Sequence, residues 1–99
     1  MPTVADFAAY LERLAPCATA AEWDNVGLLL GDPAAGVARV MTCLTLTPDV
    51  AEEAVREGAN LIVSHHPIFF RAVKKLTANS GDGKVVFPLM TAGVAVHSP

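Results

Sequence analysis

The sequence predicts a single α/β domain of a three-layer type, in which helices cover a parallel or mixed sheet built from βαβ units. Short apolar runs rich in β-branched residues alternate with stretches of helical periodicity. The composition is 53% hydrophobic and only 17% charged, as expected for a sheet that is covered on both faces. The 99 residues suffice for one hydrophobic core and leave no room for a second domain, so we treat residues 1–99 as one domain.

The first predicted element is a helix that begins after Thr3 and ends before Pro16. Thr3 is a favourable N-cap, and Asp6 lies in the first turn, where the helix dipole favours an acidic side chain. A loop that enters a short strand is expected over residues 22–33, because a brief apolar run there is bracketed by acidic residues and turn formers. The apolar positions of the first predicted helix recur with helical spacing and are Val4, Phe7, Ala8, Leu11 and Leu14.

A first βαβ unit is predicted in the middle of the chain. Residues 37–44 are apolar and β-branched, which indicates a buried strand. Thr47 and Pro48 suit the N-cap and first turn of a helix that should end at Gly58. Residues 61–63 then begin a second buried strand, and this order at short spacing is typical of parallel strands with a right-handed crossover.

The unit is expected to repeat at the end of the chain. A polar loop around residues 79–83 should precede a helix closed by Gly93, followed by a third strand at 94–96. Pro88 would remove a hydrogen bond from the middle of a helix, and we therefore expect the helix to begin near Val86.

Charge and cysteine content exclude several classes of function. The net charge is −3, and only Arg71, Lys74 and Lys75 approach a basic cluster, so nucleic-acid binding is not expected. Cys17 and Cys43 are too few for a disulfide framework, and no secretory signal is expected, because no charged segment is followed by an apolar one as in signal peptides. No apolar run approaches the roughly 18 residues that span a membrane. We expect a cytoplasmic protein.

Two adjacent histidines, His65 and His66, directly follow the second predicted strand. Ligands of parallel α/β sheets bind beyond the carboxyl ends of the strands, and neutral imidazole is a common ligand of first-row metals. We therefore predict His65 and His66 as metal ligands and assign no catalytic residue. The alternative is that both histidines cap the strand by hydrogen bonds to loop carbonyls. His97, at the next predicted strand end, could line the same crevice or lie at its rim.

The chain resembles the Nif-three-like dinuclear metal-centre family, many members of which are called GTP cyclohydrolase I type 2 homologues. The resemblance covers nearly all 99 residues and is carried by three stretches, residues 22–28, residues 58–67 with Phe69 and Arg71 after them, and residues 93–99. It implies that the chain is the N-terminal part of a larger two-domain fold and a fragment of a longer family member.

The resemblance also implies a cofactor and partners. Divalent metal ions are expected, two per full-length subunit, with zinc, iron, manganese, nickel and magnesium not distinguished. The subunits are expected to form a homo-oligomer, a ring-shaped hexamer. The implied function is that of a metal-dependent hydrolase acting on a nucleotide or another phosphate-containing small molecule. The alternative is a non-enzymatic metal-binding scaffold or regulatory protein, with this truncated chain inactive.

Two features of the sequence limit the metal site. Thr45 stands where many family members have an aspartate before the helix start, which leaves Asp24 as the best remaining candidate for a nearby carboxylate. Asp24 is equally well interpreted as a turn residue that bonds backbone amides. Two neutral imidazoles do not offset the charge of two divalent ions, so we expect the 99-residue chain alone to bind metal weakly or not at all.

Overall fold

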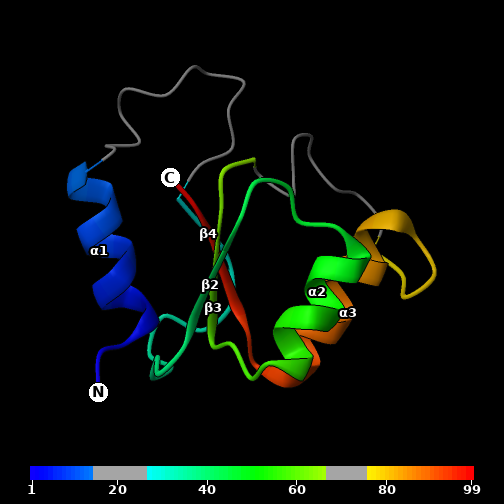
Figure 1. Cartoon of the computed structure of the whole chain (residues 1–99), viewed down its shortest axis with the longest axis horizontal. Helices are drawn as coiled ribbons and strands as arrows, with labels where there is room; N and C mark the ends of the chain where they lie inside the picture. Colours follow the sequence, from blue (N-terminus) through cyan, green and yellow to red (C-terminus); the bar gives the residue numbers. More distant parts are fainter. Residues whose placement is uncertain (15–26, 67–75) are drawn as a thin grey trace.

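The computed structural model describes residues 1–14, 27–66 and 76–99, which form three helices and a four-stranded sheet (Figure 1). Predictions on residues 15–26 and 67–75, including those for Asp24, Cys17 and the basic cluster at 71–75, lie outside the described residues. None of the helices in the described ranges is long and apolar enough to cross a membrane. The elements are α1 (Val4–Leu14), β1 (Gly27–Leu30), β2 (Val40–Cys43), α2 (Pro48–Arg56), β3 (Leu61–Ser64), α3 (Gly81–Ala92) and β4 (Ala95–Ser98).

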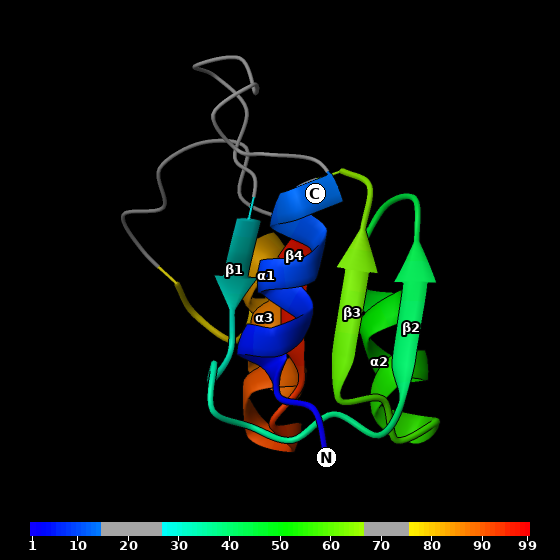
Figure 2. The same cartoon turned by 90° about the vertical axis from the view of Figure 1, so that its left-hand side faces the viewer.

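The sheet is mixed, with the strand order β1-β4-β3-β2. Strands β2, β3 and β4 are parallel, as the βαβ pattern predicts, whereas β1 pairs with β4 in the antiparallel direction. Figure 2 shows β2 and β3 pointing the same way and β1 pointing the opposite way. Leu61 of β3 is opposite Val40 on one side and Ala95 on the other, so β3 is paired along both of its edges.

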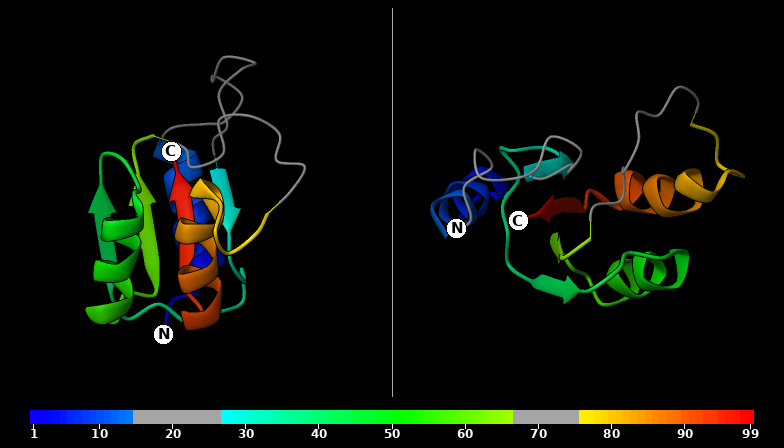
Figure 3. Two further views of the ribbon diagram at one scale, coloured as in Figure 1. Left: turned by 90° about the vertical axis from the view of Figure 1, so that its right-hand side faces the viewer. Right: turned by 90° about the horizontal axis from the view of Figure 1, so that it is seen from above.

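Helices cover both faces of the sheet, which confirms the predicted three-layer arrangement. Helix α1 lies on one face, and α2 and α3 lie side by side on the other (Figure 3). Two crossovers of the same hand that step across the sheet in the same direction bring their helices to the same face. A small cluster beneath α1 contains Val4, Val37, Leu61 and Ala95.

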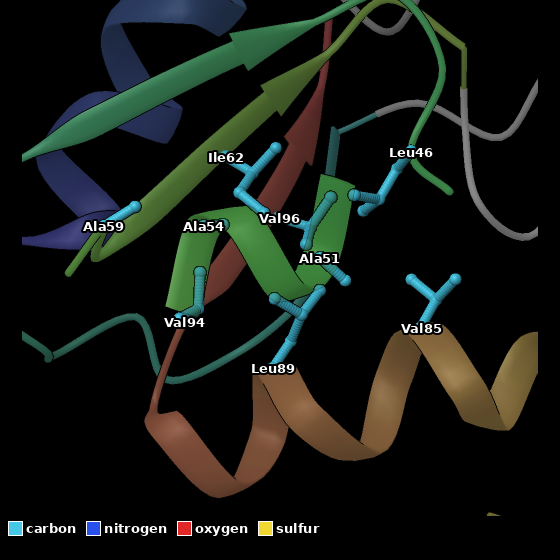
Figure 4. Packing of buried hydrophobic residues seen from close by; sticks show 9 residues of the cluster. All are labelled: Leu46, Ala51, Ala54, Ala59, Ile62, Val85, Leu89, Val94 and Val96. Carbon is cyan, nitrogen blue, oxygen red and sulfur yellow. The ribbon is translucent and has the colours of Figure 1, made fainter. Parts of the chain in front are cut away.

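The larger hydrophobic core lies between the sheet and the pair α2 and α3 (Figure 4). Ala51 and Ala54 of α2 are fully buried in this core. Leu89 fills the space between α3 and the sheet and is also fully buried. The cluster consists of Leu46, Ala51, Ala54, Ala59, Ile62, Val85, Leu89, Val94 and Val96.

The predicted N-caps of the first two helices are confirmed. The Asp6 backbone N–H donates to Thr3 Oγ1 at 3.2 Å, and the Thr3 N–H donates to the Asp6 carboxylate at 2.8 Å. The Val50 N–H donates to Thr47 Oγ1 at 3.3 Å. Gly58 follows the end of α2 with a φ of +72°, a conformation that side chains other than glycine seldom adopt.

The third helix begins earlier than the sequence predicts. It starts at Gly81 rather than near Val86, because the Ser80 hydroxyl accepts a hydrogen bond from the Gly83 N–H at 3.0 Å and so acts as the N-cap. Pro88 therefore lies inside the helix. Its missing N–H removes one hydrogen bond, and the burial of side chains such as Leu89 offsets this loss. The predicted end is confirmed, since Gly93 is the left-handed C-cap.

The prediction for β2 is also wrong in part. The strand covers Val40–Cys43 rather than residues 37–44, and its side chains alternate between exposed and half-buried. Among the strands of the described residues it is an edge strand that pairs with β3 alone, so less of it is covered than the apolar sequence indicates.

We predict opposite effects for two glycines at the start of α3. A Cβ atom on Gly83 would collide with the Thr77 carbonyl oxygen, whereas nothing lies within 4 Å of a Cβ atom on Gly81. Gly83→Ala should lower the free energy of unfolding by about 1–3 kcal/mol. Gly81→Ala should leave it unchanged or raise it by up to about 1 kcal/mol. Urea denaturation of both variants tests this pair, and equal effects would contradict the close packing at Gly83.

Candidate metal centre

His65 and His66 directly follow β3, at the edge of the sheet to which the arrowheads of β2 and β3 point in Figure 2. This is the carboxyl edge of the parallel strands, where ligands of α/β sheets bind. Both side chains are exposed, so both rings are accessible to a ligand from solvent.

The two imidazole rings lie close together. Neighbouring side chains of a regular strand point to opposite faces, so the pair can share one site only if the strand ends before it. Strand β3 ends at Ser64. The ring centroids of His65 and His66 are 5.1 Å apart, with an angle of 49° between the ring planes.

Hydrogen bonds hold the backbone of both histidines. The His65 N–H donates to the Cys43 carbonyl at 3.0 Å, and the His66 N–H donates to the Leu44 carbonyl at 2.9 Å. The Ser64 hydroxyl donates to the His66 carbonyl at 2.7 Å. In the described part of the chain, the hydrogen bonds from the two histidines to the carbonyls at the end of β2 and of Leu44 thus come from backbone N–H groups and not from the rings.

Ser64 and Ser98 are two site residues that the sequence analysis did not identify. Both are fully buried, and the Ser98 hydroxyl donates to the His65 carbonyl at 3.4 Å. Each serine hydroxyl therefore donates to the carbonyl of one histidine. A serine at the end of an otherwise apolar strand was the available indication, because a buried hydroxyl needs a partner.

Thr45 makes direct contact with one of the rings. Its Oγ1 lies 2.9 Å from Nδ1 of His66, although 21 residues separate the two along the chain. The residue that lacks the expected carboxylate therefore still contacts the histidine, through a hydroxyl. This contact occupies Nδ1 and leaves Nε2 as the other ring nitrogen.

His97 lies within the sheet and not at the rim of the crevice. It is opposite Val63 and Leu28 in β4, two residues after Ala95, and its side chain therefore faces α1. It is 2% exposed, and its buried Nδ1 has no hydrogen-bond partner among residues 1–14, 27–66 and 76–99. Burial lowers the pKa of His97 below its usual 6.5, and the negative charge of Glu12 opposes this shift.

The described residues offer two ligands for a metal ion and not a complete set. Within residues 1–14, 27–66 and 76–99, no group of three or more His, Cys, Asp or Glu side chains could hold an ion. His97 therefore does not join the pair. Cys43 is a half-buried free thiol packed against the core. The exposed imidazoles suit a divalent ion in donor chemistry, but they carry no negative charge to offset the charge of the ion.

The fold and the exposed histidine pair define a three-layer α/β protein with a candidate ligand site at the carboxyl edge of its parallel strands. Residues 2–99 match the family model described as Duf34/NIF3 (NGG1p interacting factor 3). The chain belongs to this family, which confirms the resemblance found in the sequence.

Known relatives extend well beyond the matched region. The chain is 37% identical over 95 residues to a GTP cyclohydrolase 1 type 2 homolog of Clostridium acetobutylicum, covering 96% of this chain and 35% of the relative. The crystal structure of Staphylococcus aureus hypothetical protein SA1388 is similar with a TM-score of 0.92 and 39% identity, over 98% of this chain and 28% of that chain. A Bacillus cereus protein related to NIF3 has a TM-score of 0.89 and 29% identity, over 98% and 27%. The chain thus spans 35% or less of the length of these relatives.

We predict that His97 makes the stability of the fold depend on pH. Because its pKa is lowered in the folded state, the unfolded chain binds the proton more readily. The free energy of unfolding should therefore fall as the pH decreases below about 6.5, by at most about 1.4 kcal/mol per pH unit. Urea denaturation between pH 5 and 8, about the range in which histidine titrates, measures this dependence.

The His97→Leu variant is the control for this prediction. All other titratable groups are common to both proteins, so the difference between the two pH profiles isolates His97. We expect a shallower profile for His97→Leu, and identical profiles would contradict the assignment.

Proposed function

We propose that this chain contributes His65 and His66 to a divalent metal centre. The observation that supports the proposal best is the proximity of the two exposed rings, whose centroids are 5.1 Å apart at the carboxyl edge of the sheet. Metal ions in dinuclear centres lie about 3.5–4 Å apart, so neighbouring imidazoles can each bind one ion. Two ions per full-length subunit are proposed, and zinc, iron, manganese, nickel and magnesium are all compatible with the proposal.

The remaining ligands of this centre would come from outside the described residues. Two imidazoles and the Thr45 hydroxyl carry no negative charge, whereas stable dinuclear sites are bridged or flanked by carboxylates. The relatives are about three times as long as this chain or longer, because the chain covers 24–35% of their length. A longer chain has room for the missing carboxylates.

The activity proposed for the full-length protein is metal-dependent hydrolysis of a nucleotide or another phosphate-containing small molecule. A divalent ion at this site would supply Lewis-acid catalysis and lower the pKa of a water molecule. The residues of this chain would hold the ions at an edge of the sheet that is open to solvent. Support for a nucleotide substrate comes from the name of the relatives, GTP cyclohydrolase 1 type 2 homolog.

The second candidate function is a non-enzymatic metal-binding scaffold. Large apolar side chains that remain exposed favour assembly, since such surface is normally covered by other protein. We propose a homo-oligomer, a ring-shaped hexamer, that works in the cytoplasm. Among the described residues, the exposed large apolar ones are Met1, Tyr10, Leu14, Val40, Leu44, Val55, Leu76, Phe87 and Met90.

Zinc titration of the 99-residue chain tests the metal proposal. Because the chain supplies two of the ligands that a complete site needs, we expect a Kd weaker than about 1 μM by calorimetry. The double variant His65→Ala, His66→Ala should lose this binding. His97→Leu is the matched control, since it removes one buried imidazole and should leave zinc binding unchanged.

The possible results of the titration distinguish the ligand assignment from the charge argument. Binding of the same strength in the double variant would overturn the proposal that these histidines are ligands. Tight binding that the double variant abolishes would support the ligands and overturn the charge argument. Nucleotide turnover by metal-loaded full-length protein, lost in the double variant, would favour the hydrolase over the scaffold.

A further inference from the structure

Thr45 and His66 come together from different strand ends, and their side chains meet. Thr45 follows β2 and His66 follows β3, and Oγ1 of the threonine lies 2.9 Å from Nδ1 of the imidazole. We propose that Thr45 is the positioning residue of His66 and holds Nδ1 so that Nε2 is the nitrogen presented to a metal ion. This inference deepens the proposed function and rests on it.

Two hydrogen bonds hold the backbone of His66. Its N–H donates to the Leu44 carbonyl at 2.9 Å, and its carbonyl accepts from the buried Ser64 hydroxyl at 2.7 Å. The Cα atom of His66 is therefore fixed relative to the end of β2. What remains free is the rotation of the side chain, and the contact with Thr45 restricts that rotation.

The backbone on the Thr45 side is held as well. The preceding residue, Leu44, carries the carbonyl that binds His66, and the following residue, Leu46, is buried in the main core. Thr47 then caps α2. Thr45 thus lies between fixed residues, and its hydroxyl is a stable reference for the imidazole ring.

The contact determines which ring nitrogen can bind an ion. Nδ1 is engaged by the threonine whether the hydroxyl donates or accepts, so a metal ion on His66 must use Nε2. A lone pair on Nε2 requires the proton on Nδ1, which then donates to Thr45 Oγ1. Partners of this kind on the second nitrogen orient metal-binding histidines in proteins generally, and their loss typically weakens metal affinity 10–100-fold.

If Thr45 only stabilised the fold, loss of its hydroxyl would lower the thermal unfolding midpoint, whereas a positioning role changes the His66 ring. The hydrogen bond joins two exposed side chains, and such a contact is worth little to folding because water replaces it readily. Removal of the hydroxyl should therefore leave the thermal unfolding midpoint almost unchanged. The orientation and tautomer of the His66 ring should change instead.

The test uses three variants of the chain. Thr45→Val removes the hydroxyl while it keeps the shape of the side chain, and Thr45→Ser keeps the hydroxyl. Thr42→Val is the matched control, since Thr42 is an exposed residue of β2 that receives the same substitution. The first measurement is a long-range ¹H–¹⁵N correlation spectrum of the metal-free protein, which reports the tautomer of His66 at a pH where the ring is neutral.

We expect the Nδ1–H tautomer of His66 to predominate in the unmodified chain, in Thr45→Ser and in Thr42→Val. Thr45→Val should increase the fraction of the Nε2–H tautomer. The second measurement is zinc titration, in which Thr45→Val should weaken binding by about tenfold, at the lower end of the usual range. Thr45→Ser should restore affinity to within about threefold of the unmodified chain, since it keeps the hydrogen bond.

The two measurements can fail independently. The same tautomer population in Thr45→Val and in the unmodified chain would overturn the positioning role, whatever the metal affinity. A tautomer change in a chain whose zinc binding does not depend on His65 and His66 would support the positioning role and overturn the proposed function.

Discussion

The register of β3 against its two parallel neighbours is the constraint on which the candidate site depends. Cys43 is opposite Ser64, and this pairing brings the residues after β2 alongside the residues after β3. A shift by one residue would move every side chain to the other face of the sheet and separate Thr45 from His66. Burial opposes such a shift, because Leu61 and Ile62 pack into cores on opposite faces. The hydrophobic core therefore determines the geometry of polar groups that lie outside it.

Much of the fold could be predicted because its determinants are local. The capping threonines of α1 and α2 and the glycine that closes α3 act within a few residues of the chain. The start of α3 could not be predicted so well, since Pro88 indicates a late start whereas the cap at Ser80 begins the helix at Gly81. The exposed β2 edge and the antiparallel β1 depend on which strands become neighbours, and apolar content does not reveal that order.

The candidate site likewise has features that the local sequence predicts and features that depend on how the strands pair. The location of His65 and His66 at an edge of the sheet follows from a buried strand that ends just before them. The contact of Thr45 with His66 could not be predicted, because it joins residues 21 positions apart through the register of two strands. For His97, the expected strand end at residue 96 was too early, since β4 continues to Ser98. Because His97 and Ser98 also pair with β1, the His97 ring is buried on the face of the sheet that α1 covers.

Charge explains why a well-positioned pair of imidazoles is still an incomplete site. The Thr45 hydroxyl can orient His66, as a carboxylate could, but it adds no negative charge to the site. Buried Ser64 and Ser98 support the backbone and are neutral as well. The described hydroxyl groups at this edge can thus hold the histidines in place, but they do not offset the charge of a cation. If His65 and His66 are ligands as proposed, the affinity would depend on acidic ligands from outside the described residues, whereas the contact with Thr45 would orient the His66 ring.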